Sequence, residues 1–505
     1  MADEAGKRTR GSGVRLAYDT LRDEILSLTL APGEVLDETT LAERFDMSRS
    51  PIREALIRLA GDRLVVTLSN RTTVVAPIDI QSFPKYIEAL DVAVKDGRIA
   101  ALLMRGTPTE AVERIDASGQ YVLPGAVDIH FHCRAPAYPQ RGDFATETRA
   151  AAAGGVTTVF EMPISKPCCA TGDIFRMRRQ LAEQNVYVNF GLYGAPGLLD
   201  PAEIEDMVNE GAIGFKIFTT SPPAGRDDEF EGLCLPDVTQ MYQALQLVRD
   251  TGLIIAVHSE NESLLQYHAD LMKAAGRNDV MAHGESRPPI TEALAVAELL
   301  TLNEAVGARL HIVHMTSRAA VDVLRRYQAA GVNATGETCP QYLFFTEADL
   351  VRVGPYAKIN PPLRKPDDVA ALWEALDDGT LSVVTTDHSP FTVEEKERAR
   401  TDIWRTPPGA PGVQELVLGM MDAALTGRLS INKAIELIAT NGARLFNIYP
   451  QKGVVAVGSD ADLVIYDART TTTIHPDMLF SQARHCDKLY EGKTFQGAVR
   501  RTLVN

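Results

Sequence analysis

The pattern of hydrophobic and polar positions divides the chain into two kinds of region. Up to about residue 60, apolar side chains recur at helical spacing, as at Leu16, Leu21 and Ile25. From residue 125 onward, short apolar runs of strand length alternate with helical stretches. The pattern therefore predicts a small helical part, followed by a long series of β-then-α units.

The first part predicts three helices and a β-hairpin. Asp37 is a candidate N-cap for the short second helix, "DETTLAERF", and Pro51 lies in the first turn of the third helix, "RSPIREALIRLA". The segment "RLVVTLSNRTTVVAPI" contains two β-rich runs around a polar tip. We expect a winged helix-turn-helix over residues 15–91, preceded by a disordered tail over residues 1–14.

The second part predicts a (β/α)8 TIM barrel over residues 125–439, because eight β-then-α units are typical of that fold. The predicted strands begin near "AVDIHFH", "VTTVFEMP", "VYVNFGLYG", "AIGFKIFTT", "LIIAVHSE", "RLHIVHMT", "VNATGETCP" and "LSVVTTDHSP". Strand patterns also occur on both flanks, in residues 92–124 and 440–505, and we expect them to form one small β-sandwich. The first flank begins with a hairpin that turns at Asp96-Gly97.

Composition narrows the classes of protein. A chain of 505 residues with 45% hydrophobic and 23% charged residues is typical of a globular protein with several domains. Its net charge of −16 argues against a surface that coats nucleic acid or an anionic membrane. The sequence shows no signal peptide and no apolar run long enough to span a bilayer, and its six cysteines form no CxxC pair. We expect a reduced, cytoplasmic protein.

Polar side chains occur where several predicted barrel strands end. His130 and His132 share one face of the first strand because they are two residues apart. Four more candidates belong to later strands: Lys216, His258, His314 and Asp387. Catalytic groups of a barrel gather at the C-terminal ends of its strands, so we expect these six to converge. A lone histidine in a protein is more often a structural residue than a metal ligand. Lys216 is more informative, because an unpaired ammonium group is costly to bury in an apolar strand. Carboxylation of Lys216 by CO2 would make it an anion able to bridge two cations.

Several segments in fixed order resemble the cyclic amidohydrolases, which include hydantoinases, dihydropyrimidinases, allantoinases and dihydroorotases. The segments are "VDIHFHCRAP", "GFKIF", "AVHSE", "SRPP", "LHIVHMTS", "GETCPQYL", "INPPLR", "TTDHSP" and "GSDADLVIYD". The resemblance covers residues 92–505 and implies two divalent metal ions, zinc by default, held by the six candidates with Lys216 carboxylated. It also implies that a metal-bridging hydroxide attacks the ring carbonyl, with Asp387 as general base and then general acid.

The ring that is opened depends on residues around this centre. Arg134 resembles an arginine that dihydroorotases and many allantoinases place near the site, where it could bind a carboxylate or ureide; the alternative is an ordinary arginine at the barrel mouth. Ser221 stands where hydantoinases usually carry a tyrosine, and we expect Asn360 to contact the ring imide. Ile164 and Phe391 replace an asparagine and a histidine typical of dihydroorotases. A hydantoin or ureide ring is therefore favoured, with dihydroorotate as the alternative.

The N-terminal part is similar to the DNA-binding domain of GntR-family regulators in "LAERFDMSRSPIREALIRL" and "VVAPID". The resemblance implies that four arginines face DNA: Arg49, Arg53, Arg58 and Arg71. Arg63 and Thr72 replace glycines that the family usually has in the wing, which predicts a distorted wing. The alternative interpretation is a surface helix with solvated arginines.

The junction between the two parts leaves a structural question open. Amidohydrolases usually begin with a further pair of strands, and here the wing strands occupy its place in the chain. Either the wing completes the sheet, or the fusion leaves an uncovered edge that invites pairing with another chain.

Three classes of function are compatible with this organisation: a cyclic amidohydrolase, a transcription regulator that uses the barrel as a ligand sensor, and an inactive scaffold. The complete ligand set favours the enzyme, because a sensor has no need of Asp387 as a base or of Lys216 as a bridge. The expected partners are a small cyclic amide or ureide, DNA through the N-terminal domain, and further copies of the chain in a dimer or tetramer.

Overall fold

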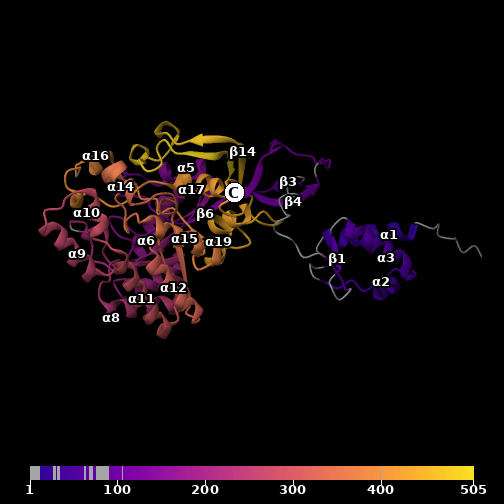
Figure 1. Cartoon of the computed structure of the whole chain (residues 1–505), viewed down its shortest axis with the longest axis horizontal. Helices are drawn as coiled ribbons and strands as arrows, with labels where there is room; N and C mark the ends of the chain where they lie inside the picture. Colours follow the sequence, from indigo (N-terminus) through magenta and orange to yellow (C-terminus); the bar gives the residue numbers. More distant parts are fainter. Residues whose placement is uncertain are drawn as a thin grey trace, which may run out of the picture. The chain divides into compact units, whose positions relative to one another are not determined.

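The computed structural model describes residues 12–26, 30, 34–61, 64–67, 72–75, 90–104, 106–223, 225–398 and 400–505. The chain separates into two compact units, Met1–Leu90 and Asp91–Asn505 (Figure 1). Most of the predicted tail, residues 1–11, and also Arg63 and Arg71 lie outside the described residues. The finer boundaries within the second unit stay predictions.

The first unit has the elements of a winged helix-turn-helix. They are α1 Ser12–Leu26, α2 Glu38–Arg44, α3 Arg49–Gly61, β1 Val65–Thr67 and β2 Thr73–Val75. Asp37 caps α2 as predicted, since its side chain accepts hydrogen bonds from the backbone N–H groups of Thr39 and Thr40. Leu21 of α1 and Ile52 of α3 are fully buried in a common core. Strands β1 and β2 form an antiparallel sheet of their own.

The second unit is built around eight parallel strands, which confirms the predicted barrel. In sheet order they are β13 Val383–Val384, β12 Ala334–Thr338, β11 Arg309–Ile312, β10 Ile254–His258, β9 Gly214–Phe218, β8 Asn189–Gly194, β7 Val156–Glu161 and β6 Ala126–Phe131. A parallel bridge between Phe131 and His388 joins the first strand to the eighth. The buried Asp128 carboxylate supports this closure, because it accepts hydrogen bonds from Thr385 Oγ1 and, at 3.0 Å, from the backbone N–H of Thr386.

Helices follow the strands and cover the outside of the barrel (Figure 1). The α-helices are α5 Phe144–Ala153, α6 Gly172–Asn185, α7 Pro201–Asn209, α8 Val238–Thr251, α9 Glu262–Ala274, α10 Val280–Glu285, α11 Pro289–Val306, α12 Arg318–Ala329, α13 Pro340–Phe344, α14 Glu347–Val353, α15 Pro366–Asp378, α16 Val393–Glu397, α17 Leu416–Leu425, α18 Ile431–Ile435 and α19 Asn441–Leu445. Short 3-10 helices are η1 Asp227–Glu229, η2 Gly354–Ala357, η3 Ile403–Arg405, η4 Val413–Glu415, η6 Pro476–Met478 and η7 Arg484–Cys486, and η5 Glu436–Thr440 is a π-helix. No helix of the described residues is long and apolar enough to cross a membrane.

Strands from both flanks of the barrel pack together, as the sequence pattern predicts. The flank strands are β3 Leu90–Lys95, β4 Arg98–Met104, β5 Tyr121–Pro124, β14 Leu463–Thr473 and β15 Thr494–Leu503. Strand β14 lies between β5 and β15 in a three-stranded sheet, and β3 pairs with β4 in a second sheet. Ile99 of β4 and Leu463 of β14 are buried in one small core.

Candidate metal centre

Three of the predicted ligands lie together at the carboxyl end of the barrel. His130 and His132 leave β6 on one face, and their Nε2 atoms lie 3.3 and 3.2 Å from the same oxygen, Oδ1 of Asp387. Asp387 follows β13 by three residues and has a φ of +46°, a left-handed conformation that costs free energy for a non-glycine residue. The backbone is therefore strained where it aims this carboxylate at the two imidazoles.

A second pair of predicted ligands lies next to this group. Nδ1 of His258 is 3.0 Å from Nε2 of His314, and both side chains are buried. His314 lies two residues beyond β11 and also has a positive φ of +40°. Burial lowers the pKa of both imidazoles, which keeps them in the neutral form that binds metal ions. Burial likewise holds the pKa of His130 and His132 well below the usual range.

Lys216 lies in the middle of β9 and is completely buried. Its Nζ has no hydrogen-bond partner among the described residues. Burial lowers the pKa of Lys216 to about 7, although the carboxylates of Glu337 and Asp387 oppose that shift. Burial also raises the pKa of Asp387 to about 7, with Lys216 opposing it. An unpaired amine of this kind is available for a further bond at the centre.

Glu337 is a central residue that the sequence analysis missed. This buried carboxylate of β12 lies 2.6 Å from Nδ1 of His130 and 2.9 Å from Nε2 of His311, and it accepts a hydrogen bond from the backbone N–H of His314. The contact with His130 directs Nε2 of that ring toward Asp387. A charged residue inside the predicted barrel strand "ATGET" was the available signal, although the threonines around it make that signal weaker than the lysine in "GFKIF".

Glu260 has the same relation to His258. Its Oε2 lies 2.9 Å from Nε2 of His258 and also accepts a hydrogen bond from Arg287. Nδ1 of His258 is thereby left to face His314. Carboxylates that hold the outer nitrogen of a histidine commonly fix the ring orientation in metal sites. The neutral imidazoles, the carboxylate of Asp387 and the unpartnered Nζ of Lys216 together fit a centre for divalent cations.

Arg134 lies beside this centre on the loop after β6. Its guanidinium is buried, donates a hydrogen bond to Ser389 and lies 5.0 Å from the ring centre of Phe391. Its Nε and Nη1 atoms are buried without a partner among the described residues. Burial, with the charges of Arg226 and Arg141, lowers the pKa of Arg134 to about 9, so the side chain stays cationic at neutral pH.

The other two predicted substrate residues differ in their surroundings. Asn360 has a buried Oδ1 with no partner among the described residues, so this oxygen is free to accept a hydrogen bond. Ser221 is exposed, and its backbone N–H donates to Glu262 Oε2 at 3.0 Å. No contact recorded for the described residues joins Ser221 to the histidines or to Asp387.

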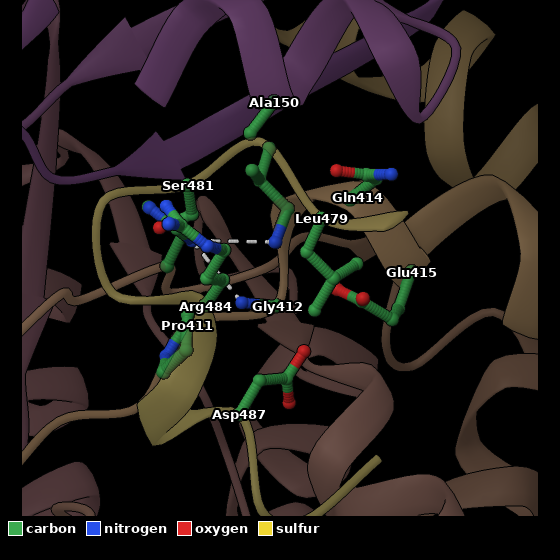
Figure 2. Close-up of a pocket in the computed structure, with 11 residues that line it drawn as sticks. Ala150, Pro411, Gly412, Gln414, Glu415, Leu479, Ser481, Arg484 and Asp487 are labelled. Carbon is green, nitrogen blue, oxygen red and sulfur yellow. Dashed lines mark hydrogen bonds between the residues drawn. The ribbon is translucent and has the colours of Figure 1, made fainter. Parts of the chain in front are cut away.

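His388, the residue that follows Asp387, is one of the residues that line a small pocket. Figure 2 shows this pocket with Glu415 and Asp487 among its lining side chains. His388 accepts hydrogen bonds at Nδ1 from the backbone N–H groups of Gly412 and Val413, and its Nε2 lies 2.7 Å from Glu147. Glu415 and Asp487 line the same pocket, and burial raises the pKa of both carboxyls, that of Glu415 to about 7. These contacts hold the loop that carries Asp387.

The predicted DNA-facing arginines of α3 are exposed, and two of them are paired with glutamates. Arg53 donates to Glu38 with its Nη2 2.6 Å from Oε2, and Arg58 donates to Glu54 at 2.9 Å. Arg49 is exposed at the start of the helix. Exposed ion pairs of this kind contribute little to stability, so each arginine can exchange its glutamate for another anion.

Comparisons with known proteins match two separate parts of the chain, one in each compact unit. Residues 121–505 match the sequence model of the amidohydrolase family, and residues 14–75 match that of bacterial regulatory proteins of the gntR family. An L-hydantoinase of Paenarthrobacter aurescens is 36% identical over 423 residues, covering 83% of this chain and 90% of that protein. An allantoinase of Rubrobacter xylanophilus is 36% identical with the same coverage. The solved structure of an L-hydantoinase (dihydropyrimidinase) from Arthrobacter aurescens superposes with a TM-score of 0.78 at 35% identity, covering 82% of this chain and 91% of that one.

Proposed function

The chain belongs to the amidohydrolase family, and from this premise we propose that its barrel hydrolyses a C–N bond of a cyclic amide or ureide and so opens the ring. The observation that carries the proposal is the convergence of His130, His132 and Asp387 at the carboxyl end of the barrel. His258 and His314 form the adjacent pair. Relatives named hydantoinase and allantoinase favour this activity over a dihydroorotase or a ligand sensor.

Members of this family use divalent metal ions, and the chain offers ligands for two. His130, His132 and Asp387 would hold one ion, and His258 and His314 the other. Lys216, once carboxylated by CO2, would provide two further oxygen atoms as ligands. Carboxylation would also remove the free-energy cost of burying an unpaired amine. When bound, such ions polarise a carbonyl group and lower the pKa of water. Zinc is the ion that a histidine-rich ligand set favours.

In this proposal, Asp387 moves the proton. It would accept a proton from the attacking water and deliver it to the ring nitrogen that leaves, so that the C–N bond breaks without a free amide anion. The side chain keeps 14% of its surface exposed, whereas those of His130 and His132 keep 4% or less. Asp387 can therefore exchange protons with a substrate while the imidazoles stay neutral.

Arg134 and Asn360 are proposed to bind the ring substituents. Arg134 has two nitrogen atoms without a partner among the described residues, and their N–H groups would donate hydrogen bonds to a ureide oxygen or a carboxylate. The unpartnered Oδ1 of Asn360 would accept from an imide N–H. Ser221 would act near the ring only if its loop brought it inward, since it is exposed here.

A substrate panel tests the activity. Full-length protein loaded with zinc should open hydantoin or allantoin, with dihydrouracil and dihydroorotate as the comparison substrates. Lys216→Ala, loaded in the same way, is the matched variant, and its turnover should fall to background. Metal-loaded wild-type protein that is inert on all four rings would refute the proposal.

A second function is proposed for the N-terminal unit, because residues 14–75 match the gntR family and α3 presents arginines on its surface. We propose that α3 binds duplex DNA through Arg49, Arg53 and Arg58, with Arg71 contributing from the wing. The glutamate partners of Arg53 and Arg58 would be replaced by phosphate groups or base edges on binding. The two activities can be tested separately, since DNA binding needs neither metal nor a cyclic substrate.

A further inference from the structure

Strand β3 pairs with β4 and, among the described residues, with no other strand. The outer edge of β4 is already used: the backbone N–H of Ile99 donates to Ser459, and its carbonyl accepts from Gly458. Figure 1 places the hairpin of β3 and β4 at the periphery of the second unit, far from barrel helices such as α9 and α10. An unpaired strand edge is a template for another strand.

The turn of this hairpin determines which backbone groups of β3 are free. Asp96 and Gly97 form a two-residue connection and both have positive φ, 49° and 74°. In such a hairpin, the residues that flank the turn exchange hydrogen bonds, and the pattern then alternates along each strand. Ile99 follows that alternation, because its groups point away from β3. The N–H and C=O groups of Val92 and Val94 must therefore point to the free edge.

The side chains of β3 fit an antiparallel copy of the same strand. In a two-fold register centred on Ala93, Val92 of each copy lies opposite Val94 of the other. The N–H and C=O groups of these two residues, which point to the free edge, then form hydrogen bonds with each other. The same register places Asp91 opposite Lys95 twice, in positions where side chains approach closely. Both charged residues are exposed, and Val94 is 45% exposed. A lysine alone would discourage edge pairing, but an aspartate at the mirrored position makes the pairing favourable.

We propose that the β3 edge binds the β3 edge of a second copy of this chain, which joins two hairpins into a continuous four-stranded antiparallel sheet. The contact is isologous, since residue 91 of each copy meets residue 95 of the other, and it closes at two copies. It does not depend on the metal centre or on the proposed hydrolysis.

A disulfide at the two-fold axis tests the contact. In this register the two Ala93 residues form a non-hydrogen-bonded pair about 4.5 Å apart between Cα atoms, within the range that a disulfide spans. Full-length Ala93→Cys should convert to a covalent dimer, with a twofold increase in mass, under mild oxidation. Five of the six native cysteines are buried and the sixth is partly buried, so wild-type protein should not crosslink.

Ala100→Cys is the matched control, because Ala100 is exposed on the neighbouring strand β4. Two such residues would be about 14 Å apart across the joined sheet, too far for a disulfide. Equal crosslinking of the two variants would overturn the proposal. So would the absence of crosslinking with Ala93→Cys, which is also the result expected if another part of the same chain covers the edge of β3. Retained turnover or circular dichroism of each variant shows that the fold is intact.

A charge exchange gives a second, reversible measurement. Asp91→Lys replaces two attractions per dimer by repulsions and should weaken self-association by about tenfold in analytical ultracentrifugation. The double variant Asp91→Lys with Lys95→Asp restores opposite charges in the same register and should recover it. Failure of the double variant to recover association would exclude this register.

Discussion

The charged groups of the barrel mouth and those of helix α3 are held in opposite ways. Lys216 and Arg134 are buried and have nitrogen atoms without partners among the described residues, whereas Arg53 and Arg58 are exposed and paired with glutamates. Burying an unpaired polar group costs free energy. A ligand that paired with these nitrogen atoms would remove that unfavourable contribution to the stability of the barrel. The pairs on α3 cost little to make or to break. The barrel mouth therefore offers buried polar atoms to a ligand, whereas the arginines of α3 already have partners that they can release.

The backbone shows the same contrast. His314 and Asp387 both hold a left-handed φ at the barrel mouth, while Arg53 and Arg58 lie within the regular turns of an α-helix. Strain of this kind persists only where the surrounding structure enforces it. Substitutions at the barrel mouth should therefore have larger effects than substitutions on α3, and the following predictions are ordered on that scale.

Asp387→Asn should have the largest effect. The amide keeps the size of the side chain but cannot accept and return a proton, so kcat on the ring substrate should fall about 10²- to 10⁴-fold. Steady-state kinetics with metal content measured in parallel provide the test. Asp270→Asn on exposed α9 is the control and should retain full activity. Turnover near that of wild type would remove Asp387 from the proton transfer.

Glu337→Gln should weaken the metal centre without removing a ligand. The amide no longer balances His130 and His311 with a negative charge, and metal affinity should fall about 10- to 100-fold. Competition with a chelator, followed by metal analysis, measures this loss directly. Exposed Glu205→Gln should leave the affinity unchanged. Unaltered affinity in Glu337→Gln would mean that the carboxylate only stabilises the barrel.

The pH dependence of stability should differ in sign between the two regions. The pKa of Glu415 is raised to about 7 by burial, so the folded state binds a proton that the unfolded state releases above its ordinary pKa. That contribution to stability is present at low pH and is lost as the pH rises toward 7 and above. The free energy of unfolding of the wild-type protein should decrease between pH 5 and pH 8. In Glu415→Gln this decrease should be smaller by about 2 kcal/mol.

Glu38 gives the opposite slope on α2. Its hydrogen bond from Arg53 lowers the pKa of the Glu38 carboxyl, so its contribution is present above the ordinary pKa and is lost on acidification. Denaturant titrations compare the two slopes, for Glu415→Gln between pH 5 and pH 8 and for Glu38→Gln from neutral pH down to below the ordinary pKa of a glutamate. A wild-type pH slope in Glu415→Gln would show that Glu415 is not the group that titrates.

Substitutions on α3 should have the smallest effects. Arg53→Ala should weaken binding to duplex DNA by about fivefold to tenfold and reduce its salt dependence, with only a small loss of folding stability from the lost ion pair with Glu38. Glu38→Gln should strengthen binding, because it releases Arg53 from its ion pair. Fluorescence anisotropy at several salt concentrations measures both, and Arg277→Ala in the second unit is the control. Wild-type protein without salt-sensitive binding would show that the N-terminal unit no longer binds DNA.

Regular elements were predictable because their signals are local. The eight apolar runs gave the order of the barrel strands, and the Asp37 N-cap and the Asp96-Gly97 turn were identified from short segments. Two strands end before the residue that was predicted to end them: His314 lies two residues beyond β11, and Asp387 lies three residues beyond β13, which contains Val383 and Val384 alone. The residue at which a strand ends depends on how neighbouring strands pair to close the barrel. A local hydrophobic pattern carries no information about that pairing.

The sequence by itself determined the barrel, the winged helix-turn-helix and the six residues proposed as ligands. Hydrophobic periodicity and polar residues at strand ends can both be identified along the chain without knowledge of the three-dimensional contacts. Only the tertiary structure decided which groups orient those ligands. Glu337 and His130 are 207 residues apart in sequence, yet they share a hydrogen bond in the barrel interior. The edge of β3 that no other described strand covers is likewise a property of the assembled sheets, since it depends on which strands lie beside β3.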